Sequence, residues 1–333
     1  MAVLEVRDLR VSFKIDKKWV PAVEDVSFSV DAGETLGIVG ESGCGKSVTS
    51  MSILHLLPEK TSRIEQGQVL YKGTDLVPLD NRAMSAYRGQ EISMIFQDSM
   101  TSLNPVLTVG RQIAEACRLH TQLTEAEAWH SALELLRRVE IPSPEKRMKE
   151  YPHQLSGGMR QRVMIAIALA RNPSVMIADE PTTALDVTIQ AQILELMKEL
   201  KRQSNTAILL ITHDMGVVAE MSDRIMVMYA GMVMEIGTAH DIFKNPMHPY
   251  TRGLLAAIPR KDRDVDELYT IEGTVPTLQT MPKGCRFCTR CKEAQPRCFE
   301  ERPPMFAKGT QQVRCWKYET PQREEDEGCS SNP

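Results

Sequence analysis

The chain has 333 residues, a quarter of them charged, and a formal net charge of −4 at pH 7. This length allows one large domain and a smaller appendage, and the small negative charge excludes a polycationic, nucleic-acid-binding character. Its apolar runs, such as Val175–Ala178 and Ala207–Ile211, are far shorter than the roughly 20 residues that a membrane span needs. The first residues, Met1–Arg7, lack a signal-peptide pattern. We therefore expect a cytoplasmic protein that reaches a membrane only through partner subunits.

The first forty residues predict strands. Apolar residues recur with the short period of a half-buried antiparallel sheet. They are Val3, Val6, Leu9, Val11, Val26, Phe28 and Val30. Thr35–Val39 is a short apolar run that predicts a buried strand, and Lys46–Leu57 predicts the helix that follows.

A glycine-rich loop joins that strand to that helix. Small residues let the backbone close around a triphosphate with its N–H groups pointing inward, and the positive end of the helix dipole faces the anion. Lys46 is placed to reach the β- and γ-phosphates, and the Ser47 hydroxyl to ligate Mg²⁺. An accidental glycine turn would not require a strand before it and a helix after it. The predicted phosphate-binding residues are Gly40, Glu41, Ser42, Gly43, Cys44, Gly45, Lys46 and Ser47.

Two acidic residues end the apolar run Val175–Ala178. The carboxyl end of a parallel strand is where ligands bind in an open α/β sheet. We expect Asp179 to hold Mg²⁺, through water, and Glu180 to polarise the attacking water. By itself, an apolar run followed by an acid is a weak signal.

The third motif, Ser156-Gly157-Gly158, lies between the other two. Ser156 is a good helix N-cap, and the two glycines leave the first amides of the helix uncovered. The result is a second anion site without a lysine. An ordinary capped helix would explain this run alone, but not its place between a phosphate loop and an acidic strand end. In this order the three motifs resemble those of the ATP-binding-cassette (ABC) family.

The resemblance implies an α/β fold: a RecA-like P-loop ATPase core, an antiparallel β subdomain and a helical subdomain. It implies ATP and Mg²⁺ as ligands. The Ser-Gly-Gly run would close over the γ-phosphate held by a second subunit, so hydrolysis would need two cassettes. Other family positions fall on Gln97 (Mg²⁺, water and the membrane partner), His213 (γ-phosphate), Asp186 (coupling of the two sites) and Phe13 (adenine stacking), with Trp19 in contention for the last role.

Finer features resemble the "D" type ATPase of oligopeptide/dipeptide importers. These are the segments around Ser156–Val163, Ala178–Gln192 and His248–Leu255. The companion "F" type tends to carry Gln where this chain has Met159. The resemblance implies peripheral attachment at the cytoplasmic face of the cell membrane, an "F"-type ATPase partner, two transmembrane permeases and an extracytoplasmic solute-binding protein. The expected cargo is a di- or oligopeptide or a related solute such as a nickel chelate.

Composition predicts the domain boundaries. Residues 1–258 form the expected ATPase domain, with the helical subdomain at about 98–172, where apolar residues between Thr108 and Val139 recur at helical spacing. Residues 259–320 form the expected cysteine-bearing C-terminal domain of the peptide-transporter type. Residues 321–333 are an acidic stretch expected to be a disordered tail.

Six of the eight cysteines crowd the last fifty residues. In a cytosolic chain such clustering favours a metal or iron–sulfur centre over disulfides. The spacing of Cys285, Cys288 and Cys291 by itself looks like part of a ferredoxin run. The family resemblance instead implies [4Fe–4S] ligands at Cys285, Cys291, Cys298 and Cys315, with Cys288 as an extra thiol. A zinc site of the same thiolates is the competing interpretation.

Two other classes of function fit the sequence less well. A soluble ABC ATPase acting on nucleic acid or ribosomes would have tandem cassettes, coiled-coil arms or insertions within the cassette, none of which the sequence shows. An iron–sulfur electron carrier would leave the ATP motifs unexplained. Both readings are weaker than that of an importer ATPase.

Overall fold

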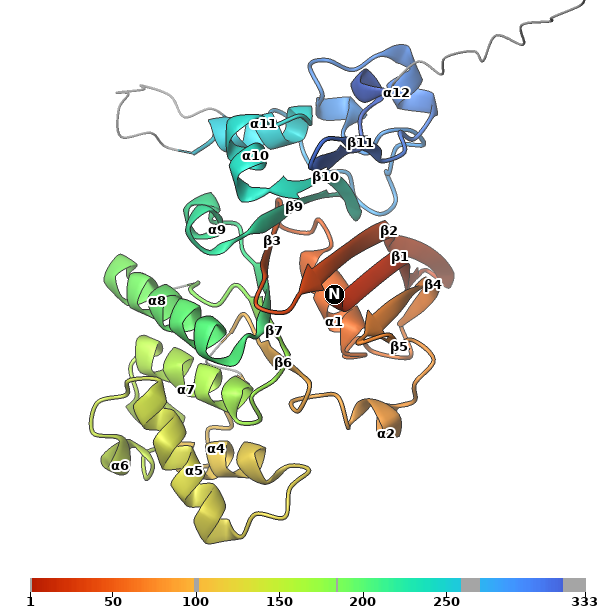
Figure 1. Ribbon diagram of the computed structural model, residues 1–333. Helices are drawn as coiled ribbons and strands as arrows, with labels where there is room; N and C mark the ends of the chain where they lie inside the picture. The colour runs from red at the N-terminus through yellow and green to blue at the C-terminus, as the bar shows by residue number, and fades with distance from the viewer. Residues whose placement is uncertain (1, 99–101, 184, 259–269, 320–333) are drawn as a thin grey trace, which may run out of the picture.

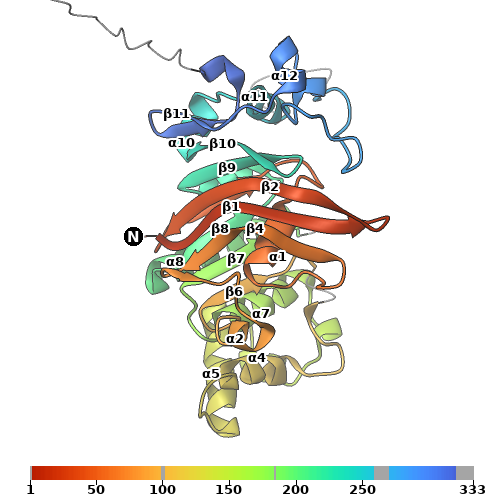
Figure 2. The ribbon, with the colours of Figure 1, turned by 90° about the vertical axis from the view of Figure 1, so that its right-hand side faces the viewer.

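The computed structural model describes residues 2–98, 102–183, 185–258 and 270–319. Within them the chain forms two sheets with helices packed around them (Figures 1 and 2). The predicted acidic tail and Cys329 lie outside the described residues.

The small sheet is antiparallel, as the N-terminal pattern predicts. It has the order β2-β1-β4-β5, and its long first hairpin buries one face because apolar side chains alternate along both strands. Its strands are β1 (Ala2–Ile15), β2 (Lys18–Asp31), β4 (Ser62–Tyr71) and β5 (Thr74–Asp75).

The large sheet has eight strands in the order β11-β12-β10-β9-β3-β8-β7-β6. From β9 to β6 neighbouring strands are parallel, whereas β10, β12 and β11 pair antiparallel. The central strands are buried along their whole length, which is why their sequences are apolar runs. The bounds are β3 (Thr35–Val39), β6 (Ile92–Ile95), β7 (Val175–Asp179), β8 (Ala207–Ile211), β9 (Arg224–Tyr229), β10 (Met232–Thr238), β11 (Phe306–Lys308) and β12 (Gln311–Val313).

Helices cover both faces of the large sheet. In Figure 1, α7 (Gly157–Leu169), α8 (Val187–Ser204) and α9 (Met215–Met221) lie on one side, and α1 (Lys46–Ile53) lies on the other, next to the small sheet. The helix after the phosphate loop is shorter than expected. It ends at Ile53 because His55 adopts a left-handed conformation (φ 51°) that an α-helix cannot contain.

The predicted helical subdomain packs around α7 at one end of the molecule (Figure 1). One continuous core joins it to the β6–β7–β8 part of the large sheet. A capping box formed by Thr124 and Glu127 begins its longest helix, α5 (Glu125–Arg138). Its other members are α4 (Val109–Arg118), α6 (Pro144–Arg147) and the 3₁₀ turn η1 (Pro152–Gln154), while α2 (Asn81–Met84) precedes β6.

The expected cysteine-rich C-terminal domain is not supported as a separate unit. Strands β11 and β12 extend the large sheet through β10, and Phe287 packs in one core with Tyr229 and Tyr250 of the ATPase part. The segment has too few apolar residues for a core of its own, so it packs against the core of the ATPase part. Its remaining elements and their neighbours are α10 (Ala239–Lys244), α11 (Pro249–Ala256), η2 (Cys288–Arg290), α12 (Pro296–Glu300) and η3 (Trp316–Tyr318).

No helix of the described residues is long and apolar enough to cross a membrane.

Candidate active site

The phosphate loop connects the buried strand β3 to the start of α1, as predicted. Gly40 is required there, because a Cβ at this position would lie 2.1 Å from the carbonyl oxygen of Met228. Gly43 has a φ of 77°, a conformation that side chains disfavour, with open space around its Cα. The loop is therefore a backbone cradle that only small residues can form.

Lys46 stands at the centre of this cradle. Its side chain is buried, and Nζ donates hydrogen bonds to the carbonyl oxygens of Gly40 at 2.7 Å and Glu41 at 3.2 Å. A pocket opens from the loop between Ser42 and Val48 and is also lined by Phe13. Trp19, the alternative to Phe13, is not among the lining residues, and the guanidinium of Arg63 covers its ring at 4.2 Å. Of the two aromatic candidates, the geometry places Phe13 beside the loop.

Asp179 lies at the carboxyl end of β7, 3% exposed. Burial raises the pKa of its carboxyl group, against the opposing effects of the Ser47 hydroxyl and the Lys46 charge. Its Oδ1 is buried with no hydrogen-bond partner among the described residues. An unpartnered buried carboxylate oxygen is costly, and a hydrated Mg²⁺ is the kind of partner that would satisfy it. Asp179 and Ser47 therefore fit the metal that the ABC fold requires.

Three side chains contact the carboxylate of Glu180. Its Oε2 accepts hydrogen bonds from Gln97 Nε2 at 2.8 Å and Thr183 Oγ1 at 2.9 Å, and its Oε1 lies 3.2 Å from Nδ1 of His213. Burial alone would raise the pKa of Glu180, but the hydrogen bonds of His213, Thr183 and Gln97 together hold that pKa below its ordinary value. The carboxylate is thus kept ionised and held in one orientation.

Sheet topology explains why the three predicted residues meet. Gln97, Glu180 and His213 each follow the carboxyl end of a strand, and those strands, β6, β7 and β8, are adjacent and parallel. Thr183 was not assigned a role from the sequence. It lies only three residues after Glu180, and this short spacing is the sequence signal that could have indicated a contact between the two side chains.

The Ser-Gly-Gly run lies at the start of α7. Ser156 is the N-cap and accepts a hydrogen bond from the backbone N–H of Met159 at 3.3 Å. A Cβ on Gly158 would lie 2.6 Å from the side chain of Ile189, so the run packs closely on the start of α8. Asp186 caps that second helix through the backbone N–H of Ile189 at 3.0 Å. The structure thus brings the predicted signature run and Asp186 together.

These residues stand apart from the phosphate pocket of the same chain. The described residues that line that pocket do not include Ser156, Gly157, Gly158 or Asp186. Within the described chain the site therefore divides into two parts, a phosphate loop with its acidic strand end and a capped helix start with no lysine.

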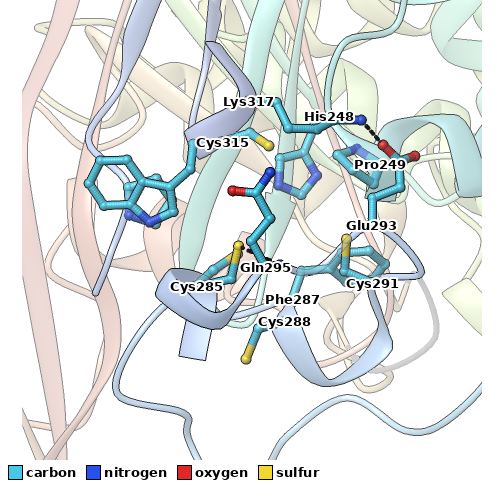
Figure 3. A pocket seen from close by; sticks show the side chains of 13 residues that line it. His248, Pro249, Cys285, Phe287, Cys288, Cys291, Glu293, Gln295, Cys315 and Lys317 are labelled. Carbon is cyan, nitrogen blue, oxygen red and sulfur yellow. Dashed lines mark hydrogen bonds and ion pairs between the residues drawn. The ribbon is translucent and has the colours of Figure 1, made fainter. Parts of the chain in front are cut away.

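Five cysteines line a second, smaller pocket together with His248 and Phe287 (Figure 3). In that view the sulfur of Cys288 points away from those of Cys291 and Cys315. None of the described cysteines forms a disulfide. The lining cysteines are Cys285, Cys288, Cys291, Cys298 and Cys315.

This arrangement does not support a zinc site. In the part of the chain that the structure describes, no three His, Cys, Asp or Glu residues are close enough to hold a single metal ion. The four thiols of the family pattern nevertheless share one pocket. A cubane cluster carries its four thiolates on separate iron corners, so it needs a wider spacing than one ion does. Among the described residues no formed site for either group is present.

Comparison with known proteins agrees with this geometry. Residues 23–183 match the family described as "ABC transporter", and residues 234–298 match "Oligopeptide/dipeptide transporter, C-terminal region". The second match begins within β10, before the boundary predicted at residue 259.

Curated relatives match along almost the whole chain. The oligopeptide transport ATP-binding protein OppD of Bacillus subtilis is 53% identical, covering 94% of this chain and 88% of its own. AppD of the same organism, also named an oligopeptide transport ATP-binding protein, is 52% identical over 95% and 97%. The dipeptide transport ATP-binding protein DppD of that organism is 52% identical over 94% of each chain.

Solved structures share the fold of the ATPase part. The ATP-binding cassette MJ0796, dimeric and bound to ADP and Pi, superposes with a TM-score of 0.64 at 28% identity, covering 71% of this chain and 98% of that one. CbiO1 of Clostridium perfringens, part of an ABC transporter complex, gives a TM-score of 0.63 at 25% identity, over 73% and 91%. The chain is therefore a member of the ABC transporter family, and its C-terminal part is the oligopeptide/dipeptide transporter C-terminal region.

Proposed function

We propose that this chain is the ATP-hydrolysing subunit of an importer for di- or oligopeptides, or related solutes such as nickel chelates, at the cytoplasmic face of the cell membrane. The observation that carries the catalytic part is the convergence of Gln97, Thr183 and His213 on Glu180. The names of the relatives support the transported class. The alternative, a soluble ABC ATPase acting on nucleic acid or ribosomes, has no support in those names.

The phosphate loop binds the phosphates of ATP. The ammonium group of Lys46, already inside the cradle, moves from the loop carbonyls to the β- and γ-phosphates, and the backbone N–H groups of Gly43–Ser47 receive the remaining oxygens. The ring of Phe13 stacks on the adenine. These contacts hold ATP before any chemistry occurs.

Ser47, Gln97 and Asp179 hold Mg²⁺. When bound, the metal would supply positive charge that neutralises the charge developing on the phosphates. The orphaned Oδ1 of Asp179 supports its place as a metal ligand, directly or through water. The predicted ligation by Gln97 would use its amide oxygen, since its Nε2 donates to Glu180.

Glu180 positions and polarises the attacking water. Its carboxylate stays ionised because three neighbours favour the charged form. His213, with a side chain that is 61% exposed, is free to contact the γ-phosphate while it orients Glu180. Together these residues provide positioning and electrostatic stabilisation, which is most of what an enzyme supplies in phosphoryl transfer.

A second cassette completes the site. Ser156, Gly157 and Gly158 form an uncovered helix start that lies outside this chain's own phosphate pocket, and MJ0796 was solved as a dimer with ADP and Pi. Val187, next to Asp186, is 84% exposed, as expected for a side chain that a partner covers. We infer that the partner is an "F"-type ATPase, because Met159 is typical of the "D" type.

The cassette pair would drive two transmembrane permeases that receive cargo from an extracytoplasmic solute-binding protein. No nucleic acid is involved. The selection of cargo would rest with the permeases and the binding protein.

We further propose that Cys285, Cys291, Cys298 and Cys315 hold a [4Fe–4S] cluster, with Cys288 outside the ligand set. Their shared pocket and the orientation of Cys288 support this assignment (Figure 3). The cluster would cross-link a segment with little core of its own, which is a structural role.

The experiment is reconstitution. The chain is coexpressed with an "F"-type ATPase, the permeases and the binding protein encoded beside it, and uptake of a panel of peptides into proteoliposomes is measured with internal ATP. We expect peptide-dependent uptake that Lys46→Ala in this chain reduces by at least tenfold. Uptake that Lys46→Ala leaves unchanged, or an assembly that hydrolyses ATP without moving any peptide or nickel chelate, would contradict the proposal.

A further inference from the structure

The pocket beside the phosphate loop has a wall that the ATPase part does not provide. Besides the loop and the β1–β2 hairpin, it is lined by Val275, Pro276, Thr277, Leu278 and Met281 of the C-terminal segment. In Figures 1 and 2 a blue loop of that segment descends toward the hairpin of β1 and β2. This wall (residues 275–281) is mainly apolar and shares the pocket with Phe13. Apolar side chains around an aromatic ring suit a purine base and its ribose, whereas the loop suits phosphates.

One buried arginine ties this wall to the phosphate loop. Arg290 ends the turn η2 among the cysteines, and its side chain is 5% exposed. Its Nη1 donates to both carboxylate oxygens of Glu41, at 3.0 and 2.9 Å. Glu41 is the second residue of the phosphate loop, and its backbone N–H donates to the Tyr250 hydroxyl at 2.9 Å. The side chain of Glu41 is therefore anchored to the C-terminal segment, and its backbone is anchored to Tyr250 of α11.

The other donors of Arg290 hold the start of the wall. Its Nε donates to the carbonyl oxygen of Glu272 at 2.9 Å, and its Nη2 to that of Ile271, also at 2.9 Å. Gly273 then turns with a φ of 80°, where a Cβ would lie 3.3 Å from the Arg290 side chain. This turn passes over the arginine and leads directly into residues 275–281. One guanidinium thus contacts both the phosphate loop and the segment that leads to the wall, and a buried charge of this kind is costly to displace.

We propose that residues 275–281 form the base-side wall of the nucleotide site and that Arg290 is the positioning residue that holds this wall in register with the phosphate loop. The inference rests on the proposed function, because it assumes that the pocket takes ATP. Arg290 itself does not line the pocket. It acts through Glu41 on the phosphate end and through Ile271 and Glu272 on the base end.

The wall and the arginine should affect the affinities for two ligands differently. Equilibrium binding of Mg²⁺-ATP and of inorganic tripolyphosphate to the full chain measures these affinities. Leu278→Ala removes wall contact alone, so it should weaken ATP binding roughly three- to tenfold and leave tripolyphosphate unchanged. Arg290→Met releases the loop and the wall, so it should weaken both ligands, ATP by roughly tenfold or more. In the assembled ATPase the same variant should raise KM for ATP more than it lowers kcat.

Controls separate positioning from general damage. Arg297→Met removes an exposed arginine of the same segment that bonds to Glu301 and Glu319 and covers Trp316, and it should bind ATP as the wild type does. If Arg290→Met does not fold, Glu41→Gln tests the same anchor from the loop side, where the side chain is 27% exposed. In a double-mutant cycle the second change should add little to the first.

The outcomes are distinguishable. If Lys46→Ala loses ATP binding while folded Leu278→Ala and Glu41→Gln bind ATP like the wild type, the inference is wrong and the proposed function stands. If the wild type and Lys46→Ala bind ATP equally poorly, the pocket is not a nucleotide site and both fail.

Discussion

Nδ1 of His213 lies 3.2 Å from Oε1 of Glu180, although 33 residues separate them. The contact exists because β7 and β8 are parallel neighbours that end at the same edge of the sheet, with Asp179 opposite Ile211. The same edge receives Gln97 from β6. A parallel sheet therefore assembles this site from three loops, none of which could form it alone.

Glu180→Gln should separate ATP binding from hydrolysis. The amide keeps the shape and accepts one of the present hydrogen bonds, but it carries no charge to polarise water. We expect a loss of turnover of roughly 10²- to 10⁴-fold with ATP affinity kept within a few-fold. Steady-state ATPase assays measure the turnover, and equilibrium binding measures the ATP affinity. Size-exclusion chromatography with ATP should show a trapped closed dimer of cassettes. Normal turnover in this variant would remove Glu180 from its assigned role.

Thr183→Val should shift the pH dependence of hydrolysis. The Thr183 hydroxyl donates to Glu180 at 2.9 Å and is one of the groups that lower the pKa of that carboxyl. Valine has the same shape without the donor, so the pKa of Glu180 should rise. Because the ionised form is the active one, the acid limb of the kcat/KM profile should move to higher pH. A profile identical to that of the wild type would mean that Thr183 does not tune Glu180.

Gly158→Asp should block the second half of the site without touching the first. A side chain at this position collides with Ile189 and places a negative charge at a helix start that we expect to receive a phosphate. ATP binding to the phosphate loop of this chain should remain within a few-fold of normal. In the Glu180→Gln background, the ATP-dependent dimer should be lost, as sedimentation velocity would reveal. A dimer of unchanged stability would argue against the trans arrangement.

Cys315→Ser and Cys288→Ser are a matched pair for the cluster. After anaerobic purification the wild type should contain about four iron and four sulfide per chain. Cys315→Ser should lose most of both, whereas Cys288→Ser should keep them. The reverse result would favour the ferredoxin-like ligand run, and zinc without iron in the wild type would overturn the [4Fe–4S] assignment.

The parts of the site that depend on local sequence could be predicted. Lys46, Ser156 and Asp186 lie at loops and helix starts. A few adjacent residues set the conformation there: small residues, capping side chains and apolar strands. The ABC fold itself, with its antiparallel sheet and α/β core, followed from these motifs and is confirmed by the solved relatives.

Other parts could not be predicted, because they depend on contacts between distant segments. Arg290 meets Glu41 across 249 residues, and nothing near either residue indicates the other. The expected separate C-terminal domain is not supported for the same reason, since β12 pairs with β10 and Phe287 packs with Tyr229 of the ATPase part.

By itself, then, the sequence determined which class of ATPase the chain belongs to and predicted which residues handle phosphate, because those functions rest on short backbone conformations. Only the tertiary structure decided how Glu180 is oriented, that Phe13 rather than Trp19 lines the pocket, and that the cysteine-bearing segment reaches the pocket beside the phosphate loop. These are properties of packing, where a side chain's partners are set by the whole fold and not by its neighbours in the chain.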